Sequence, residues 1–141
     1  MEKWLGYAFL SMVFAGCTSV IAKLGLVGIS AELGLTVRTL FVCLFVLGFA
    51  ACVIPSRELA TINAANLFWL ALSGVMTTLS WIFYYKALKL GDVGTVVLID
   101  KGSVVVALLL AWWLLREVMS FRMVVGAGLI VAGLIVIAKK S

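Results

Sequence analysis

Five long apolar runs follow one another along the chain and are separated by short polar or glycine-rich stretches. The runs are continuous and do not alternate between apolar and polar residues, so each predicts a helix and not a strand of a membrane barrel. Each reaches the length of about 20 residues that crosses the hydrocarbon core of a bilayer, the last only just. The pattern predicts an all-α membrane protein, a bundle of five transmembrane helices in one domain, residues 1–141, with spans at 4–25, 33–54, 67–87, 93–115 and 121–138.

The connections between the runs carry residues that end and start helices. Pro55 opens the longest connection, residues 55–66, in which Thr61 and Asn63 are types that cap helices. Residues 89–92 (KLGD) predict a compact turn, because glycine is favoured just after a helix end. None of the connections is long enough to form a further domain.

Composition supports the membrane interpretation. Of the 141 residues, 65% are apolar and only 12% are charged, whereas soluble domains are near half apolar and about a quarter charged. A soluble fold of this size buries only about two thirds of its surface and has no place for so much apolar surface. The composition therefore excludes a water-soluble domain.

The residue types also exclude several kinds of chemistry. The chain has no histidine, which excludes histidine acid–base catalysis and histidine-ligated metals. Cys17, Cys43 and Cys52 lie inside apolar runs without C-x-x-C spacing and are interpreted as packing residues. Because no nucleophile–base pair or metal-ligand set can be assembled, we expect no enzyme activity, no metal and no cofactor. The net charge of +5 is scattered along the chain, so we expect no nucleic-acid partner.

Five spans place the two termini on opposite sides of the membrane, and the positions of the tryptophans test which span ends lie on the same side. An interfacial aromatic belt places tryptophan at the ends of spans. The tryptophans that fall at span ends on the N-terminal side are Trp4, Trp69, Trp112 and Trp113. Trp81 is the exception, because it lies inside the third span.

Basic residues near the span ends are divided almost evenly between the two sides. Four lie near the N-terminal side, namely Lys3, Arg57, Arg116 and Arg122. Five lie near the opposite side, namely Lys23, Lys86, Lys89, Lys139 and Lys140. The positive-inside rule orients a protein by an excess on one side, and a difference of one gives almost none. Two interpretations stay open: a single orientation set by a few residues, or insertion both ways with head-to-tail pairing.

Polar and aromatic side chains from four spans converge on the half of the membrane opposite the N-terminus. A charge inside a span costs several kcal/mol at the bilayer centre, so each is a candidate for substrate binding or coupling. The candidates are Lys23, Arg38, Trp81, Tyr84, Tyr85, Asp100 and Lys101.

The spacing of these candidates predicts which of them act together. Trp81, Tyr84 and Tyr85 stand at i, i+3 and i+4 and share one helix face. Asp100 and its neighbour Lys101 point about 100° apart on a helix. We therefore expect Asp100 to meet Arg38 or Lys23 from a neighbouring helix, and not Lys101.

Two interpretations of the charged residues compete. In the structural one, Asp100 and Arg38 form a buried pair that sets helix register, while Lys23 and Lys101 extend toward the headgroups. In the functional one, the charged groups line a water-accessible cavity that binds solute, and Asp100 carries a proton. Basic groups outnumber acidic ones here, which favours a solute with an anionic group.

Several segments resemble one family of membrane proteins. Residues 79–92 (LSWIFYYKALKLGD) resemble the end of the third helix in EamA-type members of the drug/metabolite transporter superfamily. Further segments that follow the family's order are 97–101 (VLIDK), 114–117 (LLRE) and 126–133 (GAGLIVAG). Segments that resemble the short, single-repeat members are 22–26 (AKLGL) and 37–39 (VRT). The match covers nearly the whole chain.

The resemblance implies a five-helix unit that is half of an inverted-repeat transporter. Longer members carry two such units in opposite orientations around a central cavity. A single unit needs a partner, and an antiparallel homodimer, or a heterodimer with a related subunit, completes it. Smaller multidrug relatives use a glutamate in the first helix for cation and proton exchange, whereas the first span here contains no acid. Many EamA-type members also have proline near the position where Asp100 and Lys101 stand in this chain.

Together these observations predict a small secondary transporter, multi-pass in the cell (inner) membrane. We expect it to export a small metabolite by alternating access as an antiparallel dimer, with proton coupling through Asp100. Its expected partners are a small-molecule solute, the lipid bilayer and a second copy. The alternative is a non-transporting membrane interaction protein or a subunit of a larger membrane complex.

Overall fold

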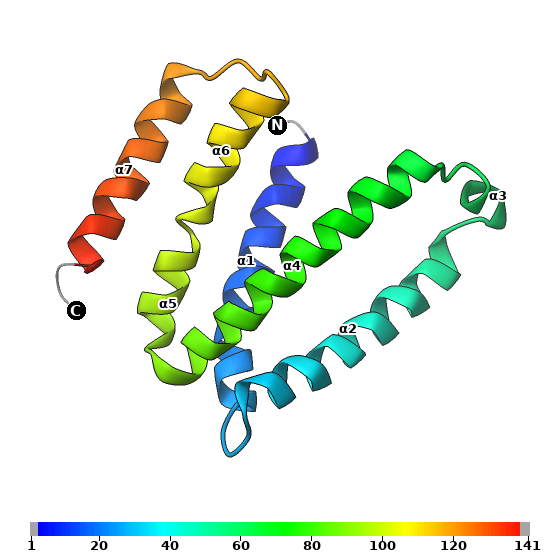
Figure 1. Ribbon diagram of the computed structural model, residues 1–141, viewed down its shortest axis with the longest axis horizontal. Coiled ribbons are helices and arrows are strands. Elements are labelled where there is room, and N and C mark those ends of the chain that lie inside the picture. The colour runs from blue at the N-terminus through cyan, green and yellow to red at the C-terminus, as the bar shows by residue number, and fades with distance from the viewer. Residues whose placement is uncertain (1–2, 139–141) are drawn as a thin grey trace. The chain divides into compact units, whose positions relative to one another are not determined.

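The computed structural model describes residues 3–138, so Lys139 and Lys140 of the charge balance lie outside the described residues. Within residues 3–138 every regular element is a helix (Figure 1). The helices are α1 (Lys3–Gly25), α2 (Ala31–Val53), α3 (Ser56–Leu59), α4 (Ala64–Leu90), α5 (Val93–Asp100), α6 (Ser103–Leu114) and α7 (Phe121–Ala138). The predicted all-α membrane fold is confirmed.

The helices match the predicted spans to within a few residues. Long and apolar enough to cross a membrane are α1, α2, α4 and the stretch Val93–Leu114, which holds α5 and α6. The apolar α7 has 18 residues and is roughly 27 Å long at the helical rise per residue, close to the thickness of the hydrocarbon core. The chain is therefore a multi-pass membrane protein. The predicted long connection contains the short helix α3, which begins directly after Pro55.

The helices group into two compact units. Residues up to Leu90 hold α1 to α4, and residues from Gly91 onward hold α5 to α7. In the first unit α2 packs along α4. Figure 1 shows the end of α1, the start of α2 and the end of α4 gathered at one end of this unit.

Most of the burial in the first unit lies at this gathered end. The buried residues there are Ser19, Leu26, Ala31, Tyr85 and Leu88. Elsewhere α1, α2 and α4 expose large apolar side chains, which meet lipid or another helix in a bilayer.

Two glycines, one in the turn between α1 and α2 and one in the first turn of α2, shape this connection. Gly28 has a φ of 77°, in the left-handed region where a side chain is disfavoured. Ser30 then begins α2, since its side chain accepts a hydrogen bond of 3.2 Å from the Leu33 N–H. Gly34 makes room for the buried Leu26, because a Cβ on Gly34 would lie 2.3 Å from the Leu26 Cδ2.

The stretch Val93–Leu114 matches the predicted fourth span, but it consists of two helices and not one. Lys101 and Gly102 separate α5 from α6. The Gly102 N–H donates to the Ile99 carbonyl at 2.9 Å, and the Val104 N–H donates to the Lys101 carbonyl at 3.1 Å. These are i to i−3 bonds, so the chain tightens into a 3₁₀ turn in the middle of the span.

Asp100 and Lys101 stand at this turn and contact each other. The Lys101 Nζ lies 3.8 Å from the Asp100 Oδ2. The expectation that Asp100 would not meet Lys101 was wrong, because the long and flexible lysine side chain reaches the neighbouring carboxylate. Gly102 also packs closely in its own unit, since a Cβ there would lie 2.8 Å from the Leu134 Cδ1 of α7.

We expect Gly34→Ala to destabilise the protein by about 1–3 kcal/mol, the usual effect of overpacking a close contact. The added methyl would displace Leu26, which is only 2% exposed. Thermal unfolding of the purified protein in detergent measures the effect. Gly48→Ala is the matched control on the same helix, because a Cβ on Gly48 meets no atom within 4 Å. Equal unfolding temperatures for the two variants would contradict the packing role of Gly34.

Candidate functional site

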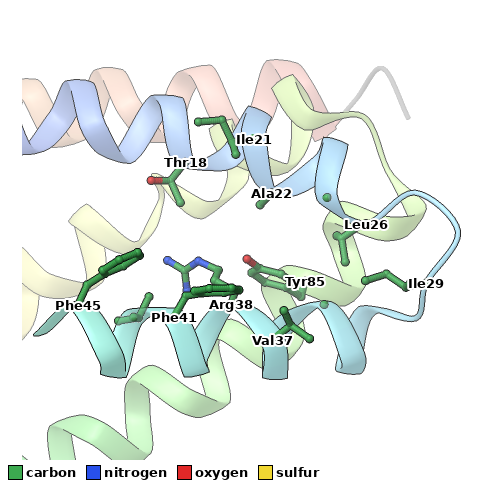
Figure 2. A pocket seen from close by; sticks show the side chains of 13 residues that line it. Thr18, Ile21, Ala22, Leu26, Ile29, Val37, Arg38, Phe41, Phe45 and Tyr85 are labelled. Atoms are coloured by element: carbon green, nitrogen blue, oxygen red, sulfur yellow. The ribbon is translucent and has the colours of Figure 1, made fainter. Parts of the chain in front are cut away.

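A cavity of about 540 Å³ lies between α1, α2 and Tyr85 of α4. Its volume is in the range of small-molecule binding pockets. From α1 and the turn after it come Thr18, Ile21, Ala22, Gly25, Leu26 and Ile29. From α2 come Gly34, Val37, Arg38, Phe41, Val42 and Phe45. The wall is mostly apolar, and Figure 2 shows the Arg38 guanidinium reaching from α2 into the space below α1.

Arg38 is the charged group of this cavity. It stands seven residues after Ala31, the first residue of α2, which places it about 10 Å along the helix. Its guanidinium carbon lies 4.3 Å from the ring centroid of Trp81 and 5.9 Å from that of Tyr85. Such cation–π contacts stabilise a charge that is shielded from water. This contact accounts for Trp81, the tryptophan outside the predicted interfacial belt.

One nitrogen of Arg38 is buried without a partner. Among the described residues, the Arg38 Nη1 is shielded from solvent and has no hydrogen-bond partner. A buried guanidinium N–H without an acceptor is costly. The aromatic contacts therefore hold the charge in place and leave part of its hydrogen-bonding capacity unused.

Tyr84 and Tyr85 lie on the predicted face of α4 and have different contacts. The Tyr84 hydroxyl donates to the Ser19 Oγ of α1 at 2.8 Å. The Ser19 hydroxyl in turn donates to the Ala15 carbonyl at 3.2 Å. Tyr85 is only 4% exposed and lines the cavity. Tyr84 thus fixes α4 to α1, while Tyr85 faces the space that Arg38 enters.

Lys23 lies at the gathered helix ends. Its ammonium donates to the carbonyl of Leu88 at the end of α4. Reciprocally, the Lys89 ammonium donates to the Leu26 carbonyl at 2.7 Å, just after α1. Since the last carbonyls of a helix have no partner within the helix and carry partial negative charge, each lysine suits the end of the other helix. Lys23 has a structural contact here and is not among the residues that line the cavity.

The structure brings together only some of the predicted site residues. Arg38 contacts both Trp81 and Tyr85 in the first unit, and of these three residues Arg38 and Tyr85 line the cavity. Asp100 and Lys101 belong to the second unit and lie at its helix break. The pairing of Asp100 with Arg38 stays a prediction.

Sequence reasoning missed the apolar residues that complete the cavity. Phe41 and Phe45 follow Arg38 at i+3 and i+7, and the two rings are stacked with centroids 6.2 Å apart. On α1, Thr18, Ala22 and Gly25 stand at i, i+4 and i+7. These helical spacings were the available signal, although uniformly apolar spans contain many such stripes.

A second cavity of about 440 Å³ lies along α2 and α4 and contains three threonines, Thr36, Thr39 and Thr78. Each threonine hydroxyl donates to a carbonyl of its own helix, at 2.8 to 2.9 Å. Glu32, which also lines it, lies 3.3 Å from the Lys86 Nζ. Because these polar groups are already engaged, the Arg38 cavity is the stronger candidate for binding a polar solute.

Among residues 3–138, no group of three or more cysteine, aspartate or glutamate side chains is placed to hold a metal ion. Cys17, Cys43 and Cys52 are free and exposed.

Comparison with known proteins identifies the family. The model of the EamA-like transporter family matches residues 2–139. The chain belongs to the EamA-like transporter family. A protein of Sinorhizobium sp. named "Uncharacterized transporter in cobO 3'region" is 31% identical over 137 residues, which cover 97% of each chain. No solved structure matches the chain.

Membership in the EamA-like family confirms the resemblance inferred from the segments 79–92 and 97–101. The family match extends through both units, so one family model covers α1 to α7. The family is one of transporters, and the chain is accordingly placed in the drug/metabolite transporter class.

We expect Lys23→Met and Lys89→Met each to lower stability by about 1–3 kcal/mol, because each leaves helix-end carbonyls without their charged donor. The unfolding temperature in detergent measures the loss. Arg57→Met in α3 is the control, since it also removes one positive charge and lies away from the gathered ends. A loss for Arg57→Met as large as that for Lys89→Met would contradict a specific role for the helix-end contacts.

Proposed function

We propose that this EamA-like protein is a secondary transporter of the cell (inner) membrane that exports a small metabolite by alternating access. The observation that carries the proposal is the cavity of about 540 Å³ that holds Arg38 among membrane-spanning helices. A charge inside an apolar span is costly, so such residues usually serve a solute or ion pathway. The proposed solute path includes Arg38, Trp81 and Tyr85.

The proposal includes an antiparallel dimer, either of two copies or with a related subunit. One five-helix repeat corresponds to half of an inverted-repeat transporter. The near-even division of basic residues, four against five, supports insertion in both orientations. The exposed apolar faces of α1, α2 and α4 offer surface for a partner helix as well as for lipid.

If the chain inserts both ways, C-terminal fusions to a reporter active in the cytoplasm and to one active outside it will both give signal.

Arg122→Gln removes one positive charge from the N-terminal side and leaves the opposite side with a clear excess of basic residues. The fraction of copies with a cytoplasmic C-terminus will then rise. Signal from only one compartment in the natural protein would contradict dual insertion and, with it, the antiparallel homodimer.

Asp100 is the proposed proton-coupling residue. It ends α5 beside the 3₁₀ turn, and the 3.8 Å separation from the Lys101 Nζ makes only a loose ion pair. Its side chain is 37% exposed. A carboxylate that is reachable and only loosely paired is suited to gain and lose a proton during a transport cycle.

We expect Asp100→Asn to abolish the pH dependence of transport in proteoliposomes while the protein stays folded, because the amide cannot exchange a proton. Asp92→Asn is the matched control, since Asp92 is an exposed residue that precedes α5. Unchanged pH-dependent flux in Asp100→Asn would contradict coupling at this residue. A monomeric protein without flux of any tested solute would instead favour a membrane interaction protein or a subunit of a larger complex.

A further inference from the structure

The unpartnered, buried nitrogen of Arg38 indicates the chemical class of the solute. Resting on the proposed transport function, we propose that the cavity binds an organic anion with a planar carboxylate on an apolar, ring-sized body. The Arg38 guanidinium would bind the carboxylate, and the apolar wall would take the body of the solute.

The need for an anion follows from the charges of the first unit. Arg38 is a permanent cation at an inner position of α2. Of the acidic residues described in this unit, Glu32 pairs with Lys86 at 3.3 Å. Glu58 lies in α3, beyond the far end of α2. The Arg38 Nη1 accordingly has no acceptor among the described residues, and a solute with an anionic oxygen would supply one.

The geometry of the guanidinium favours a carboxylate. The guanidinium carbon lies over the Trp81 ring, 4.3 Å from the ring centroid. Guanidinium N–H groups point outward in the plane of the group, and the Arg38 Nη1 on that edge has no hydrogen-bond acceptor among the described residues. A planar carboxylate binds such an edge through two parallel hydrogen bonds. A lysine in the same place could neither stack in this way nor form the paired hydrogen bonds.

The apolar wall indicates the rest of the solute. Figure 2 shows Phe45 on one side of Arg38 and Tyr85 on the other, with Phe41 beside it. Phe41 and Phe45 are stacked at an interplanar angle of 25°. Ile21 and Val37 add aliphatic surface to the same cavity. Aromatic rings stack well on such surfaces, so an aryl group attached to the carboxylate fits this wall.

Calorimetric titration of the purified full-length protein in detergent tests the inference with four matched probes. These are 3-phenylpropionate, its neutral amide, the cation 3-phenylpropylamine, and acetate, which has the carboxylate without the ring. We expect 3-phenylpropionate to bind at least about tenfold more tightly than each of the other probes. A charge-assisted hydrogen bond to Arg38 would account for the difference from the amide and the amine, and burial of the ring for the difference from acetate. Equal affinities for 3-phenylpropionate and its amide would overturn the inference.

Substitutions test whether Arg38 is the residue that gives the preference for the carboxylate. Arg38→Gln is expected to abolish the preference for the carboxylate over the amide, and Arg38→Lys to retain only part of it. Arg57→Gln, the same change outside the cavity, is expected to keep the full preference. Arg38→Lys keeps the positive charge, so its result does not depend on the folding of Arg38→Gln. An undiminished preference for the carboxylate in Arg38→Lys would overturn the bidentate contact.

Two further arms separate other sources of the anion. A fatty acid of the bilayer has the same carboxylate group. If the protein binds oleate but not 3-phenylpropionate, the inference of an aryl carboxylate solute is overturned. Asp100 is the other source, and a carboxylate preference found in Asp100→Asn but absent from the natural protein would overturn the inference in favour of an internal ion pair.

Flux assays in proteoliposomes distinguish this inference from the proposed transport function. Carboxylate-selective binding without flux would contradict transport only, whereas flux without carboxylate selectivity would contradict this inference only.

Discussion

The stacking of Arg38 on Trp81 is the contact on which the candidate site depends. A guanidinium in an apolar span must be stabilised by something other than water. Here the ring of Trp81, 4.3 Å from the guanidinium carbon, and the ring of Tyr85 provide that stabilisation. Neither ring can accept all of the N–H groups, so the residue is held in position while one nitrogen stays unpartnered. This state of the charge is the basis of the proposed anion binding.

The contacts between the ends of α1 and α4 and the start of α2 position Arg38 against the rings of Trp81 and Tyr85. Lys23 and Lys89 each bind a carbonyl at the end of the other helix, and Tyr84 binds Ser19 one turn further in. Leu26 fills the space beside Gly34. These contacts fix α4 relative to α1 and the start of α2, and the open apolar lengths of the helices beyond are left for lipid or a partner. Local burial at one end therefore positions the cavity without a large core.

The break between α5 and α6 gives the second unit a different kind of polar position. Family members with proline near this point would interrupt the helix because proline lacks an N–H. In this chain Lys101 and Gly102 produce an interruption through i to i−3 hydrogen bonds instead. The Asp100 carboxylate and the Lys101 ammonium form their loose pair at this break, so the charged pair and the interruption occupy the same position in the chain.

The sequence by itself determined the membrane class, the helical elements and their limits, because these depend on the length and continuity of apolar runs and on local residues such as Ser30 and Pro55. It also indicated that Trp81 and Tyr85 share a face, since helix geometry alone sets that spacing. Only the tertiary structure decided that Arg38 meets these rings, that Lys23 binds the Leu88 carbonyl, and that Phe41 and Phe45 complete the cavity. These contacts depend on how closely the helices approach and on backbone carbonyls that become free only at helix ends. A pattern of side-chain types encodes neither the distance between helices nor the position of these free carbonyls. In spans that are apolar on all sides, the pattern also does not show which face is buried.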